Sequence, residues 1–243
     1  LTTNLLFYSE KIAIWRNIMR EFDALSGYPE PKQPRVVRHN LRTIQHRIVA
    51  SYRDQEFFDG DRNFGYGGFN YDGRWLPIAK KMCKEYGLTN QSSVLQIGCE
   101  KGFLLNDFLQ VHPEMKVKGT EISDYPIEHA MESVKPHIQR SSFTELPFDD
   151  GEFDFVIAIG PVYIINLGDA IQCLKEIQRV GKGKNFITLG SYTNDESYWL
   201  FRNWTLLGTT ILHQDEWIEV LKHAGYTGDY KFTGAKSLNL VTS

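Results

Sequence analysis

Short apolar runs alternate with amphipathic segments along residues 76–224, and this alternation predicts a chain that switches between strands and helices. The runs typical of strands are Val94–Ile97, Met115–Glu121, His137–Arg140, Phe153–Ile159 and Asn185–Gly190. Apolar residues spaced by three and four predict helices over Leu76–Tyr86, Phe103–Val111, Ser123–Val134, Gly168–Val180 and Gln214–His223. The run Phe153–Ile159 is almost fully apolar, as expected for a central parallel strand covered on both faces. Residues 228–233 and 237–242 are expected to finish the sheet as a hairpin edge.

The first 50 residues carry two further amphipathic patterns. Residues 5–25 predict a helix that Gly27 ends, and Tyr28–Pro34 is a stiff linker that cannot be helical. A second helix is expected to follow, with one face formed by Val37, Leu41, Ile44 and Ile48. Its other faces carry Arg35, Arg38, Arg42, His46 and Arg47. A solvated basic face is the simpler interpretation, and the alternative is an anion site for a phosphate or carboxylate on a substrate.

The turn after the run Val94–Ile97 is the first candidate for chemistry. Gly98 and Gly102 bracket three residues before a helical pattern begins, which predicts a strand, a tight glycine turn and a helix. Glycines let the backbone approach a ligand closely, and the start of the helix offers unpaired N–H groups. The next strand ends about 20 residues later in Glu121, where an acidic residue of a nucleotide-binding α/β unit reaches the ribose hydroxyls.

These segments resemble the class I S-adenosylmethionine-dependent methyltransferases. The resemblance runs from about Ser92 to about Ser243 and includes VLQIGCEKG (94–102), VKGTEIS (117–123), ELPFDDGEFDFVIA (145–158), LKEIQRVGKGKNFITLGSY (174–192) and DEWIEVLKHAGYTGDYKF (215–232). It implies an α/β fold with a Rossmann-like, seven-stranded, mostly parallel sheet that has helices on both faces. Residues 76–243 are then the methyltransferase domain, and residues 1–75 an N-terminal helical and lid extension.

The resemblance also implies S-adenosylmethionine as the cofactor and assigns residues to its site. The expected cofactor-binding residues are Gln96, Gly98, Cys99, Glu100, Gly102, Glu121, Ile122, Ser142, Phe143, Gly160, Tyr71 and Arg74. Two of them depart from the family pattern, because Gln96 stands where an acid is usual and Glu100 where a glycine is usual. One hypothesis joins both departures: Glu100 supplies the carboxylate that position 96 lacks and faces the ammonium of the cofactor. The competing account is a site that has drifted and binds the cofactor weakly or not at all.

The segment Phe57–Trp75 matches no regular element, because five glycines alternate there with seven aromatic residues. In many class I methyltransferases the segment before the first strand folds over the cofactor, so a lid over cofactor or substrate is expected here. The alternative is a structural loop packed by its own aromatic side chains. The second aromatic segment, Asn194–Leu212, is expected to be helical. A core or dimer interface is the more usual role of such a helix, and the alternative is a substrate wall that faces Phe57–Trp75 across the site.

Methyl transfer from a sulfonium is an in-line displacement in which the protein mainly aligns donor and acceptor. The resemblance places the loop at Gly160–Tyr163 beneath the methyl group, so Tyr163 is a candidate for contact with the acceptor; packing under the next helix is the alternative. For a hydroxyl acceptor, the candidate bases are His213 and Asp215 near the second aromatic segment and Asp72 in the expected lid, with His129 less favoured. The expected substrate is a small polar acceptor, such as a sugar, a nucleotide-sugar or a phosphorylated metabolite, methylated on oxygen or nitrogen.

Composition narrows the partners further. The chain of 243 residues has a net charge of −3, so no general attraction to nucleic acid or anionic membranes is expected. Its three cysteines show no metal-ligand spacing and are typical of reduced thiols in a cytoplasmic protein, and no metal site is expected. No run of about 18 apolar residues predicts a membrane span. The expected partner is a small-molecule substrate, and a homodimer stays open.

Two other classes of protein also stay open. A non-catalytic scaffold or partner subunit with a methyltransferase fold is consistent with Gln96 and Glu100. A nicotinamide oxidoreductase predicts Gly-x-Gly-x-x-Gly after the first strand, but Glu100 interrupts the glycines and Gly102 lies only four residues beyond Gly98.

Overall fold

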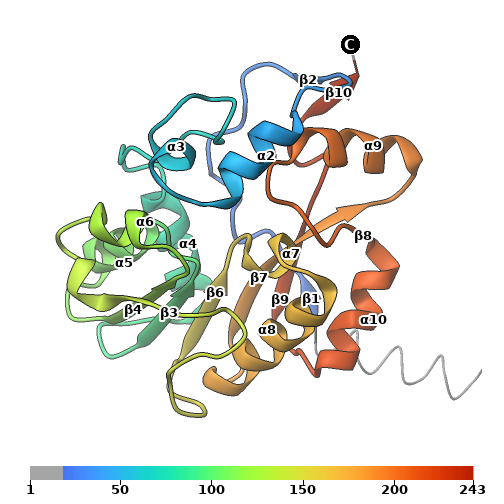
Figure 1. Cartoon of the computed structure of the whole chain (residues 1–243). Coiled ribbons are helices and arrows are strands. Elements are labelled where there is room, and N and C mark those ends of the chain that lie inside the picture. Colours follow the sequence, from blue (N-terminus) through green and yellow to red (C-terminus); the bar gives the residue numbers. More distant parts are fainter. Residues whose placement is uncertain (1–18, 243) are drawn as a thin grey trace, which may run out of the picture.

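A parallel β-sheet forms the centre of the computed structural model, which describes residues 19–242 (Figure 1). Its strands lie in the order β1–β9–β7–β6–β3–β4–β5, and β8 pairs with β7 outside this path. The bounds are β1 Arg20–Glu21, β3 Ser93–Ile97, β4 Lys116–Glu121, β5 Ile138–Arg140, β6 Phe155–Ala158, β7 Asn185–Tyr192, β8 Leu212–His213 and β9 Asp229–Thr233. All the pairings are parallel. The expected Rossmann-like α/β fold is confirmed.

Helices cover both faces of this sheet because successive side chains of each strand point to opposite faces. The helices are α4 (Leu76–Tyr86), α5 (Phe103–Val111), α8 (Leu167–Val180) and α10 (Gln214–Ala224). Val94, Phe155 and Phe186 pack with residues of α4 and α5 in one apolar cluster. The next residues along the same strands, Leu95, Val156 and Ile187, pack with residues of α8 and α10 in another. The short helices α6 (Asp124–Glu128) and α7 (Pro161–Ile164) and the 3₁₀ turn Lys135–His137 follow strand ends or lead into them.

A cap lies over the edge of the sheet where the strands reach their carboxyl ends (Figure 1). We define the cap as α2 (Ile44–Ser51), α3 (Gln55–Phe58), α9 (Asp195–Trp204) and the two-stranded sheet of β2 (Arg35–Val37) and β10 (Leu240–Thr242). Segments far apart in the sequence meet here, because β10, near residue 240, pairs in parallel with β2, near residue 36. The cap has its own apolar clusters, one of which joins α9 to β2 and β10. It therefore closes the side of the sheet on which α/β proteins bind ligands.

The expected elements outside the central sheet need four corrections. The predicted helix 5–25 lies largely outside the described residues, and its last part is wrong because Arg20–Glu21 pair with β9 as a strand. The second helix begins only at Ile44, where Thr43 caps it, since Val37 belongs to β2. The helix from Ser123 ends at Glu128, and the Met131 N–H donates to the carbonyl of Lys101 instead. The hairpin is also wrong, because a turn after β9 carries the chain away to β2.

The helix expected over Asn194–Leu212 ends at Trp204, because the backbone of Thr205 is extended. The other predicted strands and helices occur within two residues of their expected ends. In the part of the chain from residue 19 to residue 242, no helix combines the length and the apolar character that a membrane span requires.

Candidate functional site

The turn between β3 and α5 has the backbone conformation that the glycine pattern predicts. Gly98 has a φ of 64° and Gly102 a φ of 77°, both in the left-handed region. A Cβ on Gly98 would lie 2.6 Å from Cγ of Pro161, so only glycine fits between this turn and the loop after β6. Glu100 has a φ of 51°, which costs a side-chain-bearing residue on the order of 1 kcal/mol. The turn thus holds Glu100 in a strained conformation beside the carboxyl end of β3.

Glu121, at the carboxyl end of β4, is fully buried and accepts three hydrogen bonds. The backbone N–H of Glu100 donates to Oε2 over 3.0 Å, and the N–H of Ile122 donates to Oε1 over 2.8 Å. The third donor is the guanidinium of Arg53, whose Nη2 lies 3.0 Å from Oε2. The carboxylate expected to bind a ribose is therefore engaged by the protein itself in this structure.

Arg53 comes from the connection between α2 and α3, and its side chain is only 7% exposed. It has a φ of 50°, so its backbone is as unusual as that of Glu100. The guanidinium carbon lies 5.4 Å from the centre of the Phe57 ring and 5.6 Å from that of Phe58. Its Nε is buried without a hydrogen-bond acceptor in the described part of the chain. The sequence gives no signal for this residue, because its role arises only when the cap folds over β4.

Two more polar groups near the turn are poorly satisfied. The carboxyl of Glu100 has its pKa raised to about 7, mainly by burial and further by the charge of Glu121. Oε1 of Gln96, on β3, is buried and has no hydrogen-bond donor among the described residues. Buried polar groups are normally paired, so the orphaned Oε1 of Gln96 marks a place where a polar ligand can bind.

A cavity of about 120 Å³ lies above the glycine turn. It is lined by Arg53, Phe57, Tyr66, Gly98, Glu100, Phe143, Ile159, Gly160, Pro161, Tyr163, Ile164 and Leu207. A neighbouring cavity of about 380 Å³ shares Arg53, Ile164 and Leu207 with it and also contacts Ile122. Small-molecule sites usually measure about 300–1,000 Å³, so the two cavities together, but not the first alone, have that size. Arg53 lies at the border between them.

The cap is joined to this site at further points besides Arg53. Lys101, in the glycine turn, donates to both oxygens of Asp59 at 2.6 and 2.8 Å. The hydroxyl of Tyr66 accepts from the N–H of Leu206 over 2.7 Å and lies 3.1 Å from Oγ1 of Thr205. These contacts tie the segment 53–66 to β3, β4 and the end of α9. The aromatic and glycine-rich segment therefore does lie over the carboxyl edge of the sheet.

The structure brings together about half of the residues that the sequence assigns to the site. Gly98, Glu100, Phe143, Gly160 and Tyr163 line the same cavity. Glu121 contacts that cavity through Arg53 and Glu100, and Ile122 lines the neighbouring one. The pKa of the Tyr163 hydroxyl is raised, mainly by burial.

Other predicted residues lie apart from the cavity. Cys99 and Gly102 face the protein interior. Sγ of Cys99 packs against Gly119, where an added Cβ would lie only 2.6 Å away, and a Cβ added to Gly102 would lie 2.6 Å from Cγ2 of Val134. Ser142 is exposed and bonds Thr144.

The remaining candidates belong to other contacts. The hydroxyl of Tyr71 donates to Asp107 on α5 over 2.6 Å, and Arg74 pairs with Asp72. His213 caps α10 and packs edge-on against Tyr192. None of these four candidates, Tyr71, Asp72, Arg74 and His213, lines either cavity above the turn.

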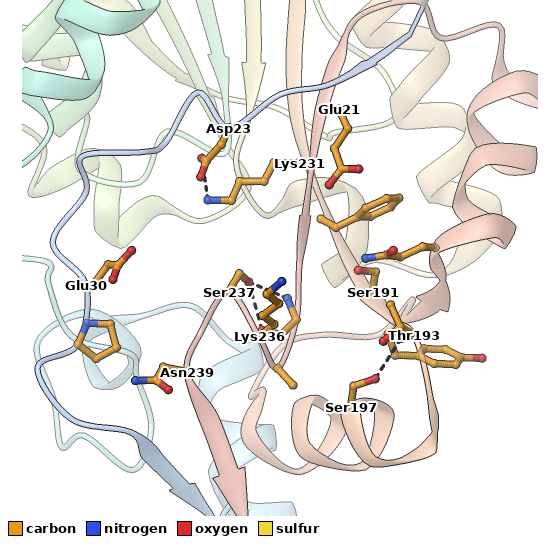
Figure 2. A pocket seen from close by; sticks show the side chains of 16 residues that line it. Glu21, Asp23, Glu30, Ser191, Thr193, Ser197, Lys231, Lys236, Ser237 and Asn239 are labelled. Atoms are coloured by element: carbon orange, nitrogen blue, oxygen red, sulfur yellow. Dashed lines mark hydrogen bonds and ion pairs between the residues drawn. The ribbon is translucent and has the colours of Figure 1, made fainter. Parts of the chain in front are cut away.

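A larger cavity of about 740 Å³ lies elsewhere, between the segment that follows β1 and the ends of β7 and β9 (Figure 2). Figure 2 shows that several charged side chains line it, among them Glu21, Asp23, Glu30, Lys231 and Lys236. Asp23 and Lys231 form an ion pair of 2.7 Å across part of it. It contains none of the glycine-turn residues, so volume alone does not locate the site.

Comparisons with known proteins bear on this site. Residues 94–184 match a family model described as a methyltransferase domain. The YcgJ protein of Bacillus subtilis has a similar fold, with a TM-score of 0.52 and 17% identity over 63% of this chain and 68% of that one. A methyltransferase from Aquifex aeolicus, described as S-adenosylmethionine-dependent, aligns with a TM-score of 0.44 and 19% identity over 64% of this chain and 89% of that one. A search of curated proteins gave no match.

The family match spans the chain from β3 to α8 and includes the glycine turn and the loop after β6, which line the cavity, whereas the lining residues Arg53, Tyr66 and Leu207 lie outside it. It gives no support to a nicotinamide oxidoreductase. The fold resemblance and the family match agree with the motifs in the sequence. Residues 94–184 therefore match the methyltransferase domain family, and the chain has the Rossmann-like fold that its solved neighbour shares.

Proposed function

We propose that this protein transfers a methyl group from S-adenosylmethionine to a small polar acceptor, on oxygen or nitrogen. The observation that carries the proposal is the convergence of Gly98, Glu100, Gly160 and Tyr163 on one cavity above the carboxyl ends of β3 and β6. Ligands of open α/β sheets bind at that edge. The division into an extension of residues 1–75 and a domain of residues 76–243 is part of the same proposal.

The residues around the cavity fit the cofactor in their chemistry. In this proposal Glu121 accepts from the ribose hydroxyls once Arg53 releases its carboxylate, and Glu100, which lines the cavity, faces the ammonium group. Nε of Arg53 and, below the cavity on β3, Oε1 of Gln96 have no hydrogen-bond partner in residues 19–242, so we assign them as a donor and an acceptor for the amino-acid part. Phe143 and Ile122 are apolar candidates for contact with the adenine. The remaining predicted cofactor residues that lie apart from the cavity are not needed for this arrangement.

Bound S-adenosylmethionine supplies an electrophilic methyl group on a sulfonium, so the protein's task is to align and enclose the reactants. Gly160 has a φ of 108°, and a Cβ there would meet no atom within 4 Å, which leaves free space at the carboxyl end of β6. Tyr163 lines the cavity from α7, and its hydroxyl has no hydrogen-bond partner among the described residues. We assign Tyr163 to positioning the acceptor. His213 and Asp72 would need a rearrangement of the cap to act as bases.

A non-catalytic partner protein is the second candidate, and one observation favours it. Arg53 already pairs with the carboxylate of Glu121, and the cavity beneath it measures only about 120 Å³. If this closed arrangement is permanent, the chain keeps the methyltransferase fold without binding the cofactor.

Calorimetric titration with S-adenosylhomocysteine distinguishes the two candidates. The enzyme proposal expects saturable binding by the wild type and binding weakened about tenfold or more in Glu100→Gln, because the neutral amide loses the attraction to the ammonium. Glu85→Gln is the matched control, since Glu85 lies on α4 and pairs with Arg20, away from the cavity. Absence of binding by a folded wild type would leave the partner protein as the better account.

A further inference from the structure

A second polar cavity, of about 550 Å³, lies on the cap and carries four arginines. They are Arg35, Arg42, Arg62 and Arg74, and the one carboxylate in the lining is that of Glu30. They come from three segments: Arg35 from β2, Arg42 from the turn before α2, and Arg62 and Arg74 from the glycine-rich segment. Residues far apart in the described chain thus place like charges around one cavity.

Most of this charge is not compensated by the protein. Arg35, Arg42 and Arg62 form no ion pair with a carboxylate in the described residues, and only Arg74 pairs, with Asp72. Burial lowers the pKa of the Arg35 and Arg42 guanidinium groups, and the positive charge of Arg62 lowers both further. Like charges held together in a protein of net charge −3 are a feature that a bound anion would explain.

Two of these arginines are held in place by the backbone. Arg42 donates from Nη1 to the carbonyls of Arg62 and Asn63 at 2.9 and 3.0 Å. Arg35 donates to the carbonyl of Leu238 over 3.0 Å, and its guanidinium lies 5.5 Å from the ring centre of Trp204. Because neutral carbonyls fix the side chains without cancelling their charge, the guanidinium groups keep their affinity for an anion.

Gly67 and Gly68 make room for the other two arginines, Arg62 and Arg74. A Cβ on Gly67 would overlap Nη1 of Arg62 at 1.7 Å, and one on Gly68 would lie 3.1 Å from Nη1 of Arg74. Both glycines also have a positive φ, of 72° and 82°. The N–H groups of Gly67 and Gly68 donate to no acceptor found in residues 19–242. The unusual composition of the segment 57–75 thus has a local structural reason, since it lets two arginines cross close to the backbone.

From these contacts we propose that the arginine pocket, defined by Arg35, Arg42, Arg62 and Arg74, binds the diphosphate or phosphate group of a small molecule. Guanidinium groups bind phosphate oxygens in pairs of parallel hydrogen bonds, and the arginines here approach from several sides. The aromatic rings in the lining are already covered, Trp204 by Tyr66 and Arg35, and Tyr28 by Arg74. Recognition therefore depends on charge and not on stacking against a base.

The arginine pocket is adjacent to the cavity above the glycine turn. Tyr66 lines both, and its ring stacks on Trp204 with centres 5.1 Å apart. If the proposed methyl transfer is right, the phosphate-bearing molecule is a candidate acceptor or its carrier. The binding proposal itself does not depend on that reaction.

Titration with inorganic pyrophosphate tests the proposal on the full chain. Saturable binding is expected, weakened about tenfold in Arg62→Gln, because one guanidinium is lost from the site. The side chain of Arg62 forms no hydrogen bond or ion pair among the described residues, and its carbonyl, which accepts from Arg42, is kept in the variant, so this substitution breaks no internal polar contact. Arg38→Gln is the matched control: it removes the same charge from the neighbouring segment, but Arg38 is exposed and does not line the pocket.

S-adenosylhomocysteine titrated into the same variants separates this proposal from the proposed function. Unchanged S-adenosylhomocysteine binding in Arg62→Gln, with weaker pyrophosphate binding, supports a distinct anion site. Pyrophosphate binding without S-adenosylhomocysteine binding would contradict the proposed methyl transfer and leave the proposal of the arginine pocket intact. Lack of saturable pyrophosphate binding, or equal weakening by Arg38→Gln, would overturn the arginine pocket, since the second result indicates general attraction by surface charge.

Discussion

The ion pair between Arg53 and Glu121 gives the most direct test of how the cap is held. Both side chains are buried, at 7% and 0% exposure, and their charged atoms lie 3.0 Å apart. We consider the substitutions Arg53→Met and Glu121→Gln, alone and combined. Methionine keeps most of the volume of the arginine stem and removes its charge, and glutamine keeps the shape of glutamate.

Removing one partner of a buried pair costs about 3–5 kcal/mol of unfolding free energy, because the other charge remains buried. Arg53→Met should lower the free energy of unfolding by about 3 kcal/mol, the low end of this range, because Glu121 keeps the N–H donors of Glu100 and Ile122. Glu121→Gln should cost more, because Nε of Arg53 already lacks an acceptor in the described structure. At about 2–4 °C per kcal/mol for a chain of this length, each single substitution lowers Tm by roughly 6 °C or more.

Urea unfolding followed by tryptophan fluorescence and by circular dichroism measures these values. The double substitution leaves no charge buried, so it should be more stable than the sum of the single effects predicts, by about 2–3 kcal/mol. Additive effects within about 0.5 kcal/mol would refute the reasoning, because the two charges would then not depend on each other. Should the single variants fail to fold, a folded double variant still reports the coupling.

Three further predictions follow from the site. Burial raises the folded-state pKa of Glu100 to about 7, above its value of 4.5 in an unfolded chain. The unfolded state therefore releases the proton first, and the free energy of unfolding falls as pH rises from about 4.5 to 7. Glu100→Gln should remove this pH dependence from urea unfolding measured across that range. Gly98→Ala should destabilise by about 1–3 kcal/mol, because it adds backbone strain and a clash with Pro161, whereas the control Gly183→Ala, with a φ of 100° and no atom within 4 Å of a Cβ, adds strain alone. Tyr66→Phe should increase hydrogen exchange at Leu206, whose N–H loses its acceptor, and unchanged exchange would contradict the assigned contact.

The central sheet could be predicted because its information is local. Each of β3, β6 and β7 is an apolar run buried on both faces, and each is followed by a helical pattern. The glycine turn could also be predicted from the sequence, because Gly98 and Gly102 adopt positive φ angles that favour glycine over other residues. Spacing along the chain then placed Glu121 at the end of the next strand.

The cap could not be predicted in the same way, since its contacts join distant parts of the sequence. β2 has three residues and pairs with β10, which lies about 200 residues later, so no local period marks either strand. Val37 was therefore assigned to a helix with Ile44, although the two belong to different elements. Arg53 is a single arginine in a polar stretch, and only the folded cap shows that it meets Glu121.

The two ion pairs between cap and sheet also bear on how a ligand enters. Arg53 and Asp59 flank α3, and they pair with Glu121 and with Lys101, which lie on either side of the cavity-lining residue Glu100. A ribose that binds Glu121 competes with Arg53 for the same oxygen, because Oε2 already accepts two hydrogen bonds. The proposed binding of cofactor therefore requires α3 to move or Arg53 to change partner. A change of partner by Arg53 is the smaller rearrangement. Nε of Arg53 has no acceptor in the described structure, and a cavity lies on either side of this side chain. The guanidinium can therefore turn toward the carboxylate of a ligand while Lys101 stays paired with Asp59.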